Sequence, residues 1–373
     1  MRVLIFPTDT GEGHNCASKA VKEHLDAEGV DTMIIDVLDT DGQKSDVVSK
    51  LYEGTVNHVP GLFGALYGFA EHISSNKRHS PIYYLNTLYG KSLLKVINEL
   101  RPQVIVCPHM FSAHAVTRLI EKYDLDIPTV GIITDYTCSP FWEETLLNRY
   151  VVAHQVVADE CVSKGMDKDK LIPLGIPVSS KFKVRLTKEE ARTVFGIQKE
   201  KVFAIMGGSM GYGKIPELAA ELVRRVPDAQ VLAVCGRNEL VYKKTKEIRG
   251  VTALRYIDNI DTVMDAADVL LTKPGGLSTT EAMTKRIPLV ITLPIPGGEV
   301  RNSAVITKLG MAVSATTMKD AADAACALLM DQIAQDKMIA AQKKNCSQSA
   351  AEDTSKLIIE MGSYGEVRLC SCV

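Results

Sequence analysis

Two stretches of this chain repeat one order of features: a short apolar run, a glycine-rich loop and a helical pattern. The first has an apolar run at 2–6, a glycine loop at 7–14 and apolar residues at helical spacing over 17–25. The second has the same features at 202–206, 207–213 and 216–226. Apolar runs of this length are typical of strands buried on both faces of a parallel sheet. The sequence therefore predicts an α/β fold of two Rossmann-like domains that face each other across a cleft.

Length and composition agree with this fold. The chain has 373 residues, of which 46% are hydrophobic and 24% charged, as in a soluble globular protein of two domains. We place the linker at 176–183, which gives an N-terminal domain of residues 1–178 and a C-terminal domain of residues 179–349. A net charge of −2 argues against a nucleic-acid partner. The sequence shows no signal peptide, no membrane-spanning run and no zinc spacing, and its nine scattered cysteines favour a reducing cytoplasm.

The stretch 272–303 is the strongest candidate for a ligand site. Gly275 and Gly276 allow a tight turn after an apolar run, and a helix follows. Such a helix start offers free N–H groups to a diphosphate. Ser278 and Glu281 have the spacing of a capping box, so Glu281 could cap the helix or could bind ribose hydroxyls. The spacing does not choose between these two roles.

His14 is the candidate for acid–base chemistry. The loop before it lacks the third glycine of a dinucleotide fingerprint, and no Walker motif follows. Imidazole titrates near neutral pH and could take a proton from a hydroxyl, although a lone histidine is more often structural. Asp135, at the end of another predicted strand, is a second candidate because ligands bind at the carboxyl ends of parallel strands.

Other segments carry more local predictions. We predict strands at 104–107, 128–134 and 150–152, and helices at 109–123, 321–345 and 350–362. A further helix at 187–195 should have Thr187 as N-cap and Glu190 at the third helical position. The aromatic residues of Phe63–Phe69 and Tyr83–Tyr89 could be buried helices or could meet a lipid headgroup layer.

Several motifs together carry a resemblance that spans nearly the whole chain. They are Thr10-Gly-Glu-Gly-His14, Ile133-Thr-Asp-Tyr136, Gly207-Gly-Ser209, Lys273-Pro-Gly-Gly-Leu-Ser-Thr-Thr-Glu281 and Pro294-Ile-Pro-Gly-Gly-Glu299 with Asn302. The chain resembles glycosyltransferase family 28, in its group of monogalactosyldiacylglycerol synthases and processive diacylglycerol glucosyltransferases.

The resemblance implies the GT-B architecture, with an acceptor site in the N-domain, a UDP-sugar in the C-domain and a last helix, about 350–373, that packs back onto the N-domain. It implies inverting transfer with no catalytic metal and no cofactor. His14 would be the general base, Asp135 a second catalytic residue, and Glu281 would bind the ribose. The other implied donor-binding residues are Gly13, Gly208, Ser209, Tyr256, Ile257, Gly275, Gly276, Ser278, Thr279, Gly298, Glu299 and Asn302.

Two departures from the family pattern leave the substrates open. Gly298 stands where the family has a glutamine that touches the sugar, and Ser139 stands where it often has histidine. We expect a hexosyltransferase that moves a sugar from UDP to a diacylglycerol-like lipid, bound peripherally to the inner face of the cell membrane. The alternatives are transfer to a soluble acceptor, a UDP-N-acetylglucosamine 2-epimerase-like enzyme and a nucleotide-sugar sensor without turnover.

Overall fold

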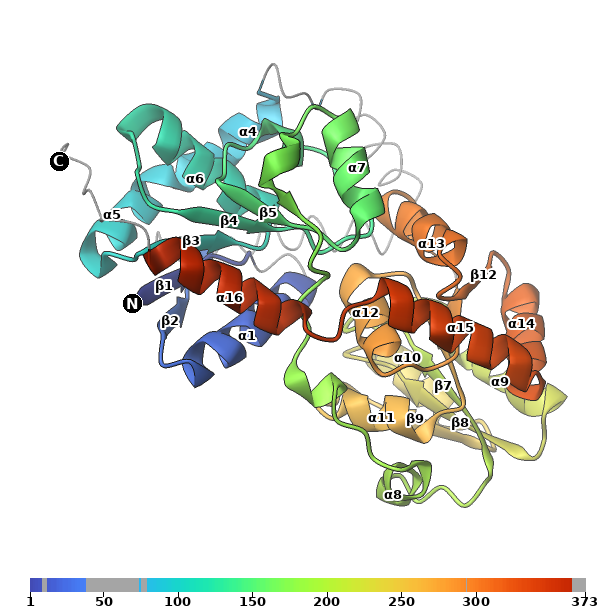
Figure 1. The fold of residues 1–373 in the computed structure, drawn as a ribbon. Helices are drawn as coiled ribbons and strands as arrows, with labels where there is room; N and C mark the ends of the chain where they lie inside the picture. Colours follow the sequence, from blue (N-terminus) through green and yellow to red (C-terminus); the bar gives the residue numbers. More distant parts are fainter. Residues whose placement is uncertain (9–11, 38–73, 75–78, 293, 364–373) are drawn as a thin grey trace. The chain divides into compact units, whose positions relative to one another are not determined.

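The computed structural model describes residues 1–8, 12–37, 74, 79–292 and 294–363 (Figure 1). The chain divides into two compact units, Met1–Ser179 with Gln348–Val373, and Ser180–Ser347. Each unit contains one parallel sheet of six strands among the described residues. The aromatic segment Phe63–Phe69, loop residues 9–11 and the C-terminal Cys370 and Cys372 lie outside the described residues.

The sheet of the first unit has the strand order β2-β1-β3-β4-β5-β6. Its strands are β1 (Arg2–Ile5), β2 (Asp31–Ile34), β3 (Val104–Cys107), β4 (Thr129–Ile132), β5 (Arg149–Val151) and β6 (Leu171–Ile172). Its helices are α1 (Glu12–Ala27), α4 (Pro81–Asn86), α5 (Gly90–Leu100), α6 (Met110–Tyr123), α7 (Gln155–Ser163) and α16 (Ala350–Ser363), with the short 3-10 helices η2 (Thr87–Tyr89), η3 (Trp142–Glu144) and η4 (Lys168–Lys170).

The core of this unit forms because its central strands are mostly apolar. Val3 on β1 is in register with Val104 on β3, and Val106 on β3 is in register with Val130 on β4. All four are buried. Helix α16 supplies Ile358 to the same cluster, and the Ser355 hydroxyl donates to the Val21 carbonyl of α1 at 3.2 Å. The last helix therefore completes the first unit, although it follows the second in sequence (Figure 1).

The sheet of the second unit has the order β12-β11-β10-β7-β8-β9. Its strands are β7 (Lys201–Met206), β8 (Ala229–Val234), β9 (Val251–Leu254), β10 (Val269–Thr272), β11 (Leu289–Thr292) and β12 (Val313–Ala315). Its helices are α8 (Lys188–Val194), α9 (Ile215–Arg225), α10 (Glu239–Thr245), α11 (Ile260–Ala266), α12 (Gly276–Thr284), α13 (Gly298–Lys308), α14 (Met318–Met330) and α15 (Gln332–Asn345), with the 3-10 helix η5 (Ser180–Phe182).

Most predicted elements are present, with two kinds of error. Strands end earlier than their apolar runs: the run at 128–134 gives β4 at Thr129–Ile132, which leaves Thr134 and Asp135 in the following loop. The single helix predicted at 321–345 is wrong. Asp331 interrupts it with φ −113° and ψ 89°, and its carboxylate caps α15 by accepting from the Ala334 N–H at 2.9 Å.

Candidate active site

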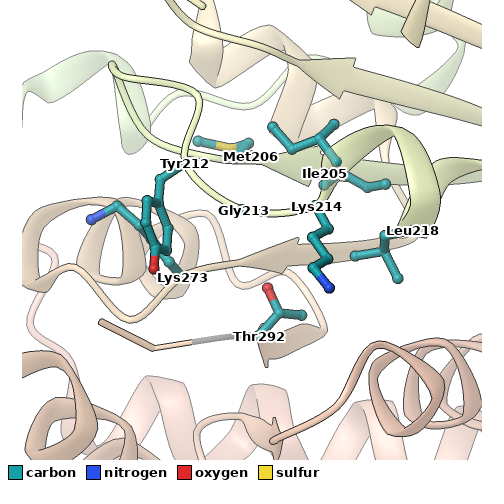
Figure 2. A pocket seen from close by; sticks show the side chains of 9 residues that line it. Ile205, Met206, Tyr212, Gly213, Lys214, Leu218, Lys273 and Thr292 are labelled. Atoms are coloured by element: carbon teal, nitrogen blue, oxygen red, sulfur yellow. The ribbon is translucent and has the colours of Figure 1, made fainter. Parts of the chain in front are cut away.

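The site in the second unit lies where its strand order reverses. Strands β7 and β10 are neighbours in the sheet, but the chain leaves them in opposite directions across it. Ligands of open α/β sheets bind at such a switch point, beyond the carboxyl ends of the strands. Here β7 leads into Gly207 and Gly208, and β10 leads into Lys273 and the glycine turn. A pocket at this point is lined by Ile205, Met206, Tyr212, Gly213, Lys214, Ile215, Leu218, Lys273 and Thr292 (Figure 2).

The loop after β7 needs its glycines. Gly208 has φ +71°, and a Cβ there would lie 3.0 Å from Cε of Lys273. A Cβ on Gly207 would lie 2.6 Å from the Tyr212 carbonyl oxygen, so a side chain at this position would displace backbone. The neighbouring Ser209 is held by its carbonyl, which accepts from the Arg237 N–H at 2.8 Å. Glycine therefore lets this loop approach Lys273 closely.

Helix α12 begins without a side-chain cap. Its N-cap is Gly275, which has no side chain to accept from the N–H groups of the first turn. The capping role that the spacing left open for Ser278 and Glu281 does not occur, because the helix begins at Gly276 and both residues already lie inside it. The N–H groups of Gly276, Leu277 and Ser278 consequently have no partner within the helix. Thr279 is less suited to a ligand, because its N–H and hydroxyl both donate to the Gly275 carbonyl, at 3.1 and 2.7 Å.

Glu281 is buried on α12, with 9% of its surface exposed. Among the described residues, none donates a hydrogen bond to its carboxylate. Burial raises the pKa of Glu281 to about 8, with the nearby charge of Lys181 lowering it and that of Asp261 raising it further. A buried carboxylate without donors is costly to fold, so this side chain is suited to a ligand that brings hydroxyl groups.

The other predicted donor residues lie on loops around α12. Lys181 donates to the Asp258 carbonyl at 2.5 Å, which ties it to the loop that contains Tyr256 and Ile257. The Tyr256 ring is 43% exposed and lies under the Arg237 guanidinium, 4.6 Å from the ring centroid. Because Lys181 also acts on the Glu281 charge, the donor-binding prediction for Tyr256 and Ile257 and the ribose-binding prediction for Glu281 concern one region of the unit.

The loop before α13 is joined to the glycine turn. The Asn302 amide donates to the Pro274 carbonyl at 3.1 Å, and Asn302 is fully buried. Glu299 accepts from the Ile295 N–H at 3.0 Å and pairs with the Lys273 ammonium. Gly298 opens α13 and brings no side chain to the site. Asn302 and Glu299 thus hold the two loops together.

The first unit has its own switch point, between β1 and β3, and His14 lies there. The His14 Nδ1 is 3.0 Å from the Pro108 carbonyl oxygen, just after β3, and 3.1 Å from the Thr134 hydroxyl, just after β4. A carbonyl oxygen can only accept, so Nδ1 carries the proton and the lone pair is on Nε2. The His109 ring packs edge-on at 4.4 Å. Gly13 stands before His14 in the first turn of α1.

His14 has the electrostatics of a neutral base. Burial lowers its pKa, while the Asp135 charge and the bond to Pro108 act in the opposite direction without overcoming burial. Asp135 accepts a hydrogen bond from the Ser139 hydroxyl at 2.9 Å, so the serine that replaces the expected histidine orients this carboxylate. The imidazole is therefore neutral near pH 7, and Asp135 favours the cation that forms when it accepts a proton.

Some residues of these sites were not predicted from the sequence. Lys273, Tyr212 and Lys214 line the pocket, and Pro108, Thr134 and His109 surround His14. The signal for Lys273 is its place directly after a strand and before the glycine turn. Within the described residues, no group of three or more His, Cys, Asp or Glu side chains could hold a metal ion. Nor does any helix described in the structure have the length and apolar character to cross a membrane.

Comparison with known proteins gives the enzyme class. Residues 14–178 match the family model of monogalactosyldiacylglycerol synthase, and residues 187–345 match the model of group 1 glycosyl transferases. The chain is a glycosyltransferase, similar to the diacylglycerol glycosyltransferases. This glycosyltransferase is 28% identical over 324 residues to the processive diacylglycerol beta-glucosyltransferase of Bacillus mycoides, covering 84% of this chain and 81% of the relative. It is 26% identical to the Staphylococcus saprophyticus enzyme of the same name, covering 99% and 91%.

Solved structures give the architecture of the glycosyltransferase as GT-B, as predicted. Acinetobacter baumannii MurG matches with a TM-score of 0.64 and 13% identity, over 96% of this chain and 99% of MurG. The UDP-GlcNAc 2-epimerase of Neisseria meningitidis, solved with UDP-GlcNAc, matches with a TM-score of 0.63 and 17% identity, over 98% and 100%. The fold is therefore shared by transferases and epimerases, and the family models are what favour transfer.

Proposed function

We propose that this glycosyltransferase moves a hexose from a UDP-sugar to a hydroxyl of a diacylglycerol-like lipid, with inversion at the anomeric carbon. The observation that carries the donor assignment is Glu281, a buried carboxylate on an uncapped helix that receives no hydrogen bond from the residues described in the structure. A nucleoside diphosphate would supply hydrogen-bond partners both for the Glu281 carboxylate and for the N–H groups at the start of α12. Its ribose hydroxyls would donate to Glu281, and its phosphate oxygens would accept from the N–H groups of Gly276 and Ser278.

The first unit supplies the base in this proposal. Nε2 of His14 takes the proton of the acceptor hydroxyl, whose oxygen attacks the anomeric carbon while the bond to the β-phosphate oxygen breaks. Asp135 stabilises the imidazolium that results. The departing UDP leaves with its negative charge against the N-terminus of α12, where amides and the helix dipole stabilise it.

The lipid acceptor and the membrane location are supported by the relatives' names and by one surface. In the aromatic segment Tyr83–Tyr89, Tyr83 is buried, while Tyr84, Leu85 and Leu88 are 58%, 62% and 72% exposed. The exposed Lys91 follows on α5. Apolar side chains beside a lysine suit the headgroup layer of an anionic membrane, and we propose peripheral binding to its cytoplasmic face. Leu85→Ser with Leu88→Ser should reduce co-sedimentation with anionic vesicles.

A donor and acceptor screen tests the function. UDP-glucose, UDP-galactose and UDP-N-acetylglucosamine are each supplied with diacylglycerol in mixed micelles, and lipid products are analysed by mass spectrometry. We expect a glycolipid with at least one donor. His14→Ala should lower its formation by about two to four orders of magnitude while UDP binding persists. Transfer to a soluble acceptor alone would contradict the lipid assignment, and epimerisation of UDP-N-acetylglucosamine without acceptor would contradict transfer.

A further inference from the structure

Lys273 lines the pocket in the second unit. It follows β10 directly, and its ammonium pairs with the Glu299 carboxylate. A Cβ built on Gly208 would lie 3.0 Å from its Cε, and one built on Gly275 would lie 3.5 Å from its Nζ. The side chain therefore lies between the two glycine loops of the switch point. Figure 2 shows it beside Tyr212, with Lys214 and Thr292 across the pocket.

Glu299 is held from two sides. One carboxylate oxygen, Oε1, pairs with Lys273, and the other, Oε2, accepts from the Ile295 N–H at 3.0 Å. The side chains of Lys273 and Glu299 are 24% and 16% exposed, so the pair is partly shielded from water. Its oxygens are thus engaged within the protein, although the resemblance assigns Glu299 to the donor sugar. Sugar hydroxyls can occupy Oε1 once the ammonium has moved.

A diphosphate at the start of α12 would change this balance. Gly275 is the N-cap of that helix. The Lys273 ammonium lies close to Gly275, since a Cβ built on Gly275 would be 3.5 Å from Nζ. A diphosphate carries more negative charge than one carboxylate and offers several acceptor oxygens, so it competes effectively for the ammonium. The two lysines of the pocket, Lys273 and Lys214, give the phosphate region a positive charge without a metal ion.

We propose that Lys273 is an exchangeable counter-ion, held by Glu299 in the ligand-free chain and transferred to the diphosphate when the donor binds. The exchange frees one oxygen of Glu299 for the hydroxyls of the transferred sugar. Donor binding and sugar recognition are thereby coupled through one lysine. UDP without a sugar leaves that oxygen without a partner, which favours the complete UDP-hexose over the UDP product. This inference rests on the proposed UDP-sugar donor.

The test asks whether substitutions of Glu299 and Lys273 strengthen or weaken the binding of UDP. Calorimetry measures the affinity for UDP alone and for UDP-glucose. Glu299→Gln keeps an amide oxygen for the Ile295 N–H but removes the charge that holds Lys273. We expect it to bind UDP on the order of three- to tenfold more tightly, since the competing carboxylate is gone. Its preference for UDP-glucose over UDP should shrink. Lys273→Met should weaken UDP binding at least tenfold, and Lys273→Arg should retain most of the affinity.

A matched control separates the exchange from a general change of charge. Asp228 pairs with Lys201 in the same unit, with its side chain 67% exposed, so Asp228→Asn removes the same charge elsewhere. It should leave UDP affinity within twofold. In a Lys273→Met background, Glu299→Gln should no longer strengthen UDP binding, because there is no ammonium for it to release.

The outcomes also separate this inference from the proposed function. If the unaltered chain binds neither UDP nor UDP-glucose, the proposed function itself is wrong. If the unaltered chain binds UDP and Glu299→Gln weakens that binding or leaves it unchanged, the exchange of Lys273 is wrong and the proposed function stands. Equal strengthening by Asp228→Asn would likewise overturn the exchange.

Discussion

Helices α8 and α12 carry the same capping pattern at different positions and use it differently. In α8, Thr187 accepts from the Glu190 N–H at 3.2 Å, and Glu190 accepts from the Thr187 N–H at 2.8 Å. The hydrogen bonds that the Thr187 hydroxyl and N–H donate to the Glu190 carboxylate lower its pKa. In α12, Ser278 caps nothing, and burial without donors raises the pKa of Glu281 to about 8. Glu190 therefore stabilises its own helix, whereas Glu281 is available to bind a ligand.

The difference arises before each helix. Gly275 has an extended conformation, with φ −66° and ψ 134°, and the chain enters the helix at Gly276. Ser278 is then already helical and cannot act as the N-cap, which needs a non-helical backbone. At α8 the extended residue is Thr187 itself, with φ −62° and ψ 154°. A capping pattern therefore predicts a cap only where no earlier turn starts the helix.

Glu281→Gln should have the largest effect on ligand binding. A hydrogen bond to a charged group contributes about 1.5–3 kcal/mol, so UDP affinity should fall on the order of 10- to 100-fold. Glu190→Gln should change it less than twofold, since Glu190 is engaged with Thr187. Calorimetric titration of both variants, with circular dichroism to confirm their fold, checks this. Equal UDP affinity in the Glu281→Gln and unaltered chains would contradict the assignment of Glu281 to ligand binding.

Glu281→Gln should also stabilise the ligand-free protein at high pH. Because the folded-state pKa of Glu281 lies above its unfolded value of about 4.5, the folded chain binds the extra proton. The stability contributed by Glu281 is therefore greatest in acid and declines as pH rises from about 4.5 through 8. At pH 8, Glu281→Gln should raise the free energy of unfolding by roughly 1–3 kcal/mol, with little change at pH 4.5. Denaturant unfolding at both pH values measures this, and an equal effect at both would contradict it.

The cap residues should give the smallest and most selective effects. Thr187→Ala should lower the free energy of unfolding by about 1 kcal/mol without altering UDP affinity, because it removes a real N-cap. Ser278→Ala should change stability by less than about 0.5 kcal/mol, as it lies inside its helix. Thermal unfolding of the two variants compares them directly. A larger loss in Ser278→Ala than in Thr187→Ala would mean that the assignment of the caps is reversed.

Much of the fold follows from sequence patterns that are local. Apolar runs fixed the central strands, such as β3 at the predicted 104–107, and the Thr187 box was confirmed at α8. The family motifs pointed to GT-B, which the structural comparisons confirm. The catalytic and donor-binding roles, the domain limits and the expected cleft stay predictions, as does the absence of a cofactor.

What the sequence could not supply are contacts made by distant segments. Pro108 and Thr134 lie 94 and 120 residues from His14, and no spacing rule connects them. Lys273 and Glu299 are 26 residues apart and meet because their loops leave neighbouring strands, β10 and β11. The burial of Glu281 likewise depends on where α12 begins, which the glycine turn decides rather than the capping pattern.

The number of protons released when the donor binds tests most directly whether Glu281 binds the ribose. Ribose hydroxyls that donate to Glu281 should return its pKa toward the ordinary range, so the protonated carboxyl should ionise on binding. At pH 7, UDP-glucose titrations in buffers of different ionisation enthalpy should show release of nearly one more proton from the unaltered chain than from Glu281→Gln. Equal proton release by the two proteins, with both binding UDP-glucose, would contradict the account.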